Sequence, residues 1–282
     1  MGLKTWLGLK RKLAKKTNRP LVHSIPVNPA IDTNDHNFRA SIEQVDVCIV
    51  AGRRPDLLER TLTSFDARLF RNFQIVGVYA NIDPVFGDSD DHLATSEVIR
   101  SFFPTAEIRE PEQANFCAAV QSNWARTKSE FLIHIEDDWI LNSEITPELL
   151  IDFADPSIAQ ISFNMKTKNW RPEHGDFHYI KKKSPDTGAF TFGLPAFGTS
   201  PSFLRGAFAR KSAHLFDTAF DPEKQFFCGA NAVLETFASQ YRVKMFSRPD
   251  MHIVTDIGRQ WRDQRGIAKT ILNGTSIWST GA

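Results

Sequence analysis

Three consecutive carboxylates, Glu136, Asp137 and Asp138, directly follow a short apolar run at residues 131–135. Such a run is typical of a buried parallel strand, and ligands of open α/β sheets bind beyond the carboxyl ends of the strands. Adjacent carboxylates repel one another unless a cation or a set of hydrogen bonds compensates them. A divalent metal ion that carries a phosphorylated ligand is the simplest compensation. A solvated acidic turn after an ordinary strand fits the same residues.

The segments upstream of these acids predict the elements that position them. A strand at residues 45–50 is followed by a turn containing Gly52 and by a helix that begins at Pro55, a residue type that suits the first helical position. Strands and helices then alternate: a strand at 73–80, a helix at 93–103, a strand at 106–108, a helix at 115–127 and the strand at 131–135. This alternation predicts an α/β fold, a three-layer sandwich with a mostly parallel central sheet. Residues 44–140 form its ligand-binding half.

The second half, residues 141–282, is less regular and is assigned to the same domain. Thr146 and Pro147 predict a helix start, and residues 166–188 are rich in Lys, Pro, Gly and Asp, which predicts a long loop. The remaining expected elements are strands at 158–163 and 243–246, a strand leading to a helix at 202–209, and a helix at 232–241.

Composition and charge exclude some classes of protein. The chain has 282 residues, 41% of them hydrophobic, and a net charge of +1. Residues 1–20 carry seven Lys and Arg and no acid, so the remainder has a net charge of −6. It therefore lacks the positive surplus that nucleic acid selects, and we expect no nucleic-acid partner. The three widely spaced cysteines fit neither a disulfide framework nor a zinc site, which favours a reducing compartment and a cytoplasmic protein.

Residues 1–43 are predicted to be a basic N-terminal arm and a linker. Residues 1–16 interleave Lys and Arg with Trp6 and leucines. The apolar stretch is too short and too interrupted for a signal peptide or a membrane span. A basic amphipathic helix lying on an anionic membrane surface fits this pattern, as does a solvated tail. The first alternative predicts a peripheral membrane protein.

Two common nucleotide-binding motifs are missing from the sequence. No Gly-x-x-x-x-Gly-Lys-Ser/Thr occurs, and no Gly-x-Gly-x-x-Gly follows the first strand. A P-loop ATPase site and a dinucleotide Rossmann site are therefore disfavoured. What remains is an α/β domain with arginines after strand one, Asp83 after strand two and the three acids after strand four.

This arrangement resembles the GT-A class of nucleotide-sugar glycosyltransferases, in particular the family 2-like group. The resemblance covers about residues 45–260, and its motifs lie at residues 47–58 and 131–138, the second at the position of the D-x-D signature. It implies a GT-A (Rossmann-like) sandwich that transfers a sugar from a nucleoside-diphosphate-sugar donor to a hydroxyl acceptor, a glycan or a lipid-linked glycan. It also implies Mn²⁺ or Mg²⁺ as cofactor. Asp138 would contact the metal, and Glu136 and Asp137 would hold the ribose or the base.

Further residues are candidates for the donor site. Arg53 could contact phosphate or stack on a base, and Asp83 could accept a hydrogen bond from the base. Asn115 begins the helix before the acid strand and could reach the same pocket. These three residues could equally be a surface arginine, a turn-forming aspartate and a helix cap.

The segment after residue 250 is the expected closing segment. Enzymes of the resembled class often donate a late histidine to the metal, and His252 stands at a suitable place; neutral imidazole is a competent Mn²⁺ ligand. Arg259 and Arg262 could clamp a diphosphate or a sugar when the segment folds over the site. A structural histidine and a salt-bridged surface turn are the alternatives.

The acceptor side departs from the family pattern. An inverting transferase needs a general base, which the family commonly supplies from a Gly-Glu-Asp type motif at a helix start. In the equivalent stretch, Cys228 to Glu235, Ala230 and Asn231 replace the acids. Glu223 or Glu235 is the predicted base, or the mechanism is not the usual inverting one. Trp139 and Ser202 are the candidates for the acceptor and sugar side of the pocket.

Two other functions remain open at this point. A sugar-1-phosphate nucleotidyltransferase has a related architecture, but its Gly-rich loop after strand one is missing beyond Gly52. A catalytically silent module that binds a sugar or a nucleotide is the second, because the acidic pair is absent at residues 230 and 231.

Overall fold

A computed structural model describes residues 30–166, 170, 175–183, 190–249, 251–272 and 275–280. The basic segment at residues 1–16 lies outside these described residues. Among the helices that are described, none is both long and apolar enough to cross a lipid bilayer.

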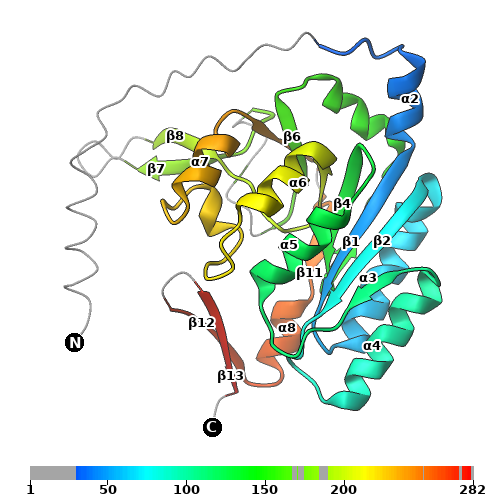
Figure 1. Cartoon of the computed structure of the whole chain (residues 1–282), viewed down its shortest axis with the longest axis vertical. Helices are drawn as coiled ribbons and strands as arrows, with labels where there is room; N and C mark the ends of the chain where they lie inside the picture. The colour runs from blue at the N-terminus through cyan, green and yellow to red at the C-terminus, as the bar shows by residue number, and fades with distance from the viewer. Residues whose placement is uncertain are drawn as a thin grey trace.

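A seven-stranded, mostly parallel sheet forms the centre of the molecule (Figure 1). Only β9 runs antiparallel to its neighbours within this sheet. The strand order is β10 (Arg242–Phe246), β6 (Ile158–Phe163), β9 (Ser202–Arg205), β4 (Phe131–Glu136), β1 (Gln44–Ala51), β2 (Gln74–Ile82) and β3 (Glu107–Arg109). The sheet joins strands from both halves of the sequence.

Helices cover both faces of this sheet, which gives the three layers that the sequence predicts (Figure 1). On one face lie α3 (Pro55–Arg68) and α4 (Ser89–Phe102); on the other lie α5 (Phe116–Arg126), α6 (Gly206–Leu215) and α7 (Ala232–Ala238). Strand β1 shows why both faces are needed. Its Val47 and Ile49 belong to the core cluster under α3, while Cys48 and Val50 belong to the cluster under α5. Successive strand side chains point to opposite faces, so a strand buried on both sides reads as a continuous apolar run.

Two elements differ from the prediction at their N-termini. Helix α4 begins four residues before the expected Leu93, because Asp88 and Asp91 form a capping box ahead of the apolar positions. The segment after Thr146 is a 3₁₀ helix, η2 (Pro147–Ala154), and the Thr146 side chain does not cap it.

The predicted linker ends in a helix, α2 (His36–Ile42), which was not predicted from the sequence. The Asp35 carboxylate caps it by accepting a hydrogen bond from Phe38 N at 2.9 Å. Phe38 and Ile42 are buried, and the Phe38 ring packs edge-on against Phe131 at the start of the acid strand. Residues 36–42 therefore belong to the folded domain.

The predicted loop at residues 166–188 is also wrong in part. Strand β7 (Tyr179–Lys183) lies within it and pairs antiparallel with β8 (Phe190–Pro195). Both strands lie outside the main sheet, so neither carries the long apolar run of a buried strand.

A small antiparallel pair brings the C-terminal segment to the acids. Strand β5 (Trp139–Leu141) continues the chain directly after the acids and pairs with β11 (Val254–Asp256). Helix α8 (Gly258–Asp263) follows β11, and a final hairpin, β12 (Ile267–Leu272) with β13 (Thr275–Thr280), comes after it.

Candidate active site

A cavity of about 430 Å³ lies at the carboxyl ends of the parallel strands β1, β2 and β4. The N-terminus of α5, residues 218–221 and α8 complete its wall. Eight residues that the sequence predicts for the site line it: Asp83, Asn115, Glu136, Asp137, Asp138, Trp139, Arg259 and Arg262. The topology thus brings together side chains from positions 83 to 262 of the chain.

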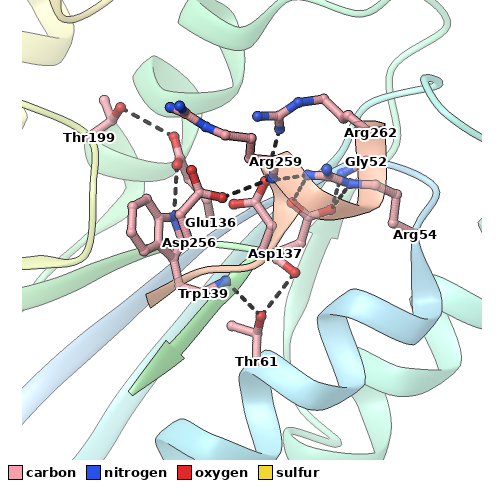
Figure 2. A network of polar contacts seen from close by, with 11 residues as sticks. Gly52, Arg54, Thr61, Glu136, Asp137, Trp139, Thr199, Asp256, Arg259 and Arg262 are labelled. Atoms are coloured by element: carbon pink, nitrogen blue, oxygen red, sulfur yellow. Dashed lines mark hydrogen bonds and ion pairs between the residues drawn. The ribbon is translucent and has the colours of Figure 1, made fainter. Parts of the chain in front are cut away.

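Asp137 is the most firmly held of the three acids. Its carboxylate accepts hydrogen bonds from Gly52 N at 2.9 Å and from Arg54 Nε at 3.0 Å, and its second oxygen pairs with Arg54 Nη2. The Thr61 hydroxyl donates to the Asp137 carbonyl at 2.9 Å and accepts from Trp139 N at 3.0 Å. Figure 2 shows this arrangement, in which α3 fixes the turn between β4 and β5. Every oxygen of the Asp137 carboxylate is therefore engaged within the protein.

Asp138 faces the C-terminal segment. Its Oδ2 lies 3.1 Å from Arg54 Nη2 and 3.5 Å from Arg262 Nη1. The backbone of the closing segment also touches it, because Ile257 N donates to the Asp138 carbonyl at 2.9 Å. A Cβ placed on Gly258 would lie 1.9 Å from Asp138 Oδ2, so only glycine permits this approach.

Burial and charge shift the protonation of this cluster. Burial raises the pKa of Asp138 to about 6, against the lowering effect of Arg54. Burial alone would lower the pKa of Arg54, but Asp137 and Asp138 raise it above its usual value, so the guanidinium stays charged. The cluster is thus a set of acids that an internal cation partly neutralises.

Glu136 points to a different neighbourhood from the other two acids. It accepts a hydrogen bond from Trp139 Nε1 at 3.1 Å, and its second oxygen lies 3.2 Å from the Thr199 hydroxyl. The same hydroxyl lies 3.1 Å from Glu223 Oε1. One hydroxyl carries one proton, so it can donate to only one of these carboxyls at a time. Burial, and then the nearby charges of Asp138 and Glu223, raise the pKa of Glu136 well above its usual value.

Asp83 lies across the cavity from these acids, at the end of β2. It is 6% exposed and accepts a hydrogen bond from Asn81 Nδ2 at 2.8 Å. Burial raises its pKa. Asn115 caps α5 by accepting from Ala118 N at 2.9 Å, so it is both a helix cap and part of the cavity wall.

The register of β11 decides which C-terminal residues reach the cavity. Asp256 pairs with Trp139 and lines the cavity, whereas His252 lies before β11, is exposed, and is absent from the cavity wall. Asp256 Oδ1 also accepts a hydrogen bond from Arg259 N at 3.1 Å, at the start of α8. Figure 2 shows Arg259 and Arg262 extending from this helix over the acids.

Besides His252, four predicted residues lie outside the cavity wall. Arg53 donates to the Gly87 carbonyl at 3.4 Å, and Glu235 accepts from Gly229 N at 2.8 Å near the start of α7. Ser202 is fully buried in β9 and bonds to Gln160 Nε2 at 2.7 Å. Glu223 Oε1 accepts a hydrogen bond from Thr199 N at 2.9 Å and lies 3.1 Å from the Thr199 hydroxyl.

Conversely, Arg54, Asp221 and Asp256 line the cavity but were not assigned to it from sequence. Arg54 stands beside Arg53, and strand geometry alone does not show which of two adjacent arginines turns inward. A signal existed for Asp256, since this acid comes directly after the short β-branched stretch of residues 253–255.

The residues of the cavity wall fit a divalent metal ion that is held by one or two carboxylates and by a phosphate. Mg²⁺ and Mn²⁺ are often held by one or two carboxylates together with substrate phosphates. Asp138 and Asp256 line the same cavity and lie close enough for Asp256 to raise the pKa of Asp138. Among the described residues, no group of three or more His, Cys, Asp and Glu side chains could hold a metal ion alone. The remaining ligands of such an ion would be water or the oxygens of a bound phosphate.

Neither a protein-family model nor a curated protein matches the sequence. Solved structures do match. The mannosyltransferase PcManGT from Pyrobaculum calidifontis, solved with GDP-Man and Mn²⁺, is 13% identical with a TM-score of 0.50; the match covers 93% of this chain and 68% of that one. S. aureus TarS 1-349, solved with UDP, is 15% identical with a TM-score of 0.46, over 75% of this chain and 59% of that one. The match to PcManGT and the mostly parallel sheet confirm the predicted architecture: the chain has the GT-A glycosyltransferase fold.

Proposed function

We propose that the protein is a metal-dependent glycosyltransferase that moves a sugar from a nucleoside-diphosphate-sugar to a hydroxyl of a glycan or a lipid-linked glycan. One observation carries the proposal. The three acids after β4 share a cavity with Arg54, Arg259 and Arg262 at the carboxyl ends of the parallel strands. Arginines suit a diphosphate, and carboxylates suit the metal ion that accompanies it. PcManGT, whose fold is similar, binds GDP-Man and Mn²⁺, which agrees with this assignment.

The residues of the cavity wall suggest where each part of the nucleoside-diphosphate-sugar would bind. Asp83 and Asn115 are proposed to receive the nucleobase, and Arg259 and Arg262 the diphosphate. Asp138 and Asp256 would hold Mn²⁺ or Mg²⁺, an ion that offsets the negative charge of a nucleoside diphosphate leaving group. Trp139, with its indole fixed by Glu136, would border the sugar.

The general base is proposed to come from residues 221–223. A base must lie within hydrogen-bond reach of the acceptor hydroxyl from which it takes the proton. Asp221 lines the cavity, and burial raises the pKa of its carboxyl, which makes it a stronger base. Glu223 does not line the cavity and contacts Thr199 N and the Thr199 hydroxyl, so we assign it the role of holding Thr199 in place.

Turnover of UDP- and GDP-sugars with Mn²⁺ tests the proposal. Asp138→Asn is expected to abolish metal-dependent turnover. Asp221→Asn is expected to lower the transfer rate by about 10²–10⁴-fold and leave nucleotide affinity unchanged, since a base acts on the acceptor. Glu223→Gln is the comparison, with a smaller effect expected. Nucleotide binding without turnover would favour the silent module, and nucleotide formation from a sugar-1-phosphate would favour the nucleotidyltransferase.

A further inference from the structure

Arg54 is a cation enclosed in the acid cluster. Its side chain is 6% exposed and contacts both carboxylates, with two bonds to Asp137 and one of 3.1 Å to Asp138. Aromatic rings flank the guanidinium, whose carbon lies 4.7 Å from the Phe86 ring centre and 5.5 Å from that of Trp261. The residue is thus held by the strand ends and by the closing helix α8 together.

Phe86, whose ring lies against the Arg54 guanidinium, has an unusual backbone conformation. Its φ of 73° is the only positive value among the described non-glycine residues, and such a conformation is costly for a bulky residue. A Cβ on Gly52 would lie 2.8 Å from the Phe86 ring, so the turn after β1 needs glycine to admit that ring. Strain at this position places an aromatic face against Arg54.

One nitrogen of the Arg54 guanidinium makes no hydrogen bond to the described part of the chain. Arg54 Nη1 is buried and has no hydrogen-bond partner among the described residues, although Arg54 lines the cavity. A buried donor without an acceptor costs free energy. Arg54 therefore places a positive charge in the cavity wall, with one donor nitrogen that no described residue uses.

We infer that Arg54 is the resident cation of the acid cluster, and that a divalent metal ion binds at Asp138 only together with a nucleoside diphosphate. This inference rests on the proposed function. Without nucleotide, a metal ion at Asp138 would lie beside the fixed charges of Arg54 and Arg262. A diphosphate adds negative charge that offsets both cations. Arg54 is then a positioning and phosphate-contact residue that excludes a free metal ion.

The test measures Mn²⁺ binding to the full-length protein in the absence of nucleotide, by electron paramagnetic resonance of the free ion. Arg54→Gln is expected to bind Mn²⁺ at least about tenfold more tightly than the wild type, which corresponds to about 1.4 kcal/mol. Arg53→Gln is the matched control, since Arg53 lies outside the cavity wall and should not alter Mn²⁺ binding. Adding Asp138→Asn to Arg54→Gln should remove the gained site.

Equal Mn²⁺ affinity of the wild type and Arg54→Gln without nucleotide would overturn the inference. If Arg54→Gln does not fold, Arg54→Met replaces it: this unbranched side chain also removes the charge, so tighter Mn²⁺ binding is again expected and equal binding overturns the inference. A second series with UDP or GDP present separates the two proposals. Failure of both nucleotides to bind contradicts the proposed function, whereas the nucleotide-free series bears only on Arg54.

Discussion

At the scale of single residues, His134 is a fully buried histidine in the strand that ends in the acid cluster. It lies in β4 two positions before Glu136, is fully buried, and its Nδ1 accepts a hydrogen bond from Trp124 Nε1 at 3.1 Å. Burial lowers the pKa of His134 to about 3, although the nearby charge of Glu223 opposes this shift. The histidine is therefore neutral in the folded protein near neutral pH.

This lowered pKa predicts a loss of stability in acid. An unfolded histidine titrates near pH 6.5, so between about pH 6.5 and 3 the unfolded state binds a proton that the folded state does not. The stability contributed by neutral His134 is present above pH 6.5 and is lost as the pH falls, by about 3 kcal/mol at pH 4.5. Urea unfolding from pH 7.5 to 4.5 should therefore show a smaller loss for His134→Asn than for the wild type. Parallel curves would contradict the lowered pKa.

The closing segment is the decisive element. Strand β11 and helix α8 are held to the site by backbone pairing with β5, by the Ile257 bond to Asp138, and by Trp261, whose Nε1 donates to Asp56 at 3.2 Å. The Trp261 ring also meets Phe86 edge-on. These contacts join residues after 250 to β5, to the start of α3 and to the residues that follow β2 and β4, all of them more than a hundred positions away in the sequence.

Gly258→Ala tests how closely α8 must approach the acids. The added Cβ would meet the Asp138 carboxylate, so either α8 or Asp138 must move. Overpacking of this kind costs about 1–3 kcal/mol, and we expect at least about tenfold weaker nucleotide binding, measured by calorimetry. Gln260→Ala, an exposed position on the same helix, is the control. Nucleotide affinity that is the same in both variants would show that the close approach is not required.

For the whole molecule, the uneven distribution of charge predicts a membrane contact. Residues 1–20 carry seven basic residues and no acid, while the remainder of the chain is net negative. A basic segment gains about 1 kcal/mol per Lys or Arg near an anionic surface. Co-sedimentation should show the full chain bound to vesicles containing phosphatidylserine and released by salt. Deletion of residues 1–18 should abolish binding, and binding that survives this deletion would rule out the arm as the anchor.

Local sequence patterns were sufficient to predict most of the strands and helices in residues 44–140. The run before Glu136, the glycine turn before Pro55 and the alternation of strands and helices each follow from short-range rules, and they predicted β1, α3, β2, α5 and β4. The predicted linker and the second half were harder to predict, because their elements depend on packing against or pairing with other segments. Helix α2 is short and is stabilised by one cap and by two side chains that are buried against the rest of the domain. Strand β7 is stabilised by its antiparallel pairing with β8, which its own residues do not reveal.

The sequence by itself determined the mostly parallel character of the sheet, the edge of the sheet at which the cavity lies, and the three acids at that edge. Strand and helix periodicity is written in each segment, and parallel strands must end at a common edge. Only the tertiary structure decided which side chains share the cavity. The register of β11 on β5 placed Asp256 there and left His252 exposed. The packing of Phe86 and Trp261 placed Arg54 beside Asp138. Register and packing depend on contacts between distant residues, so no short stretch of sequence contains them.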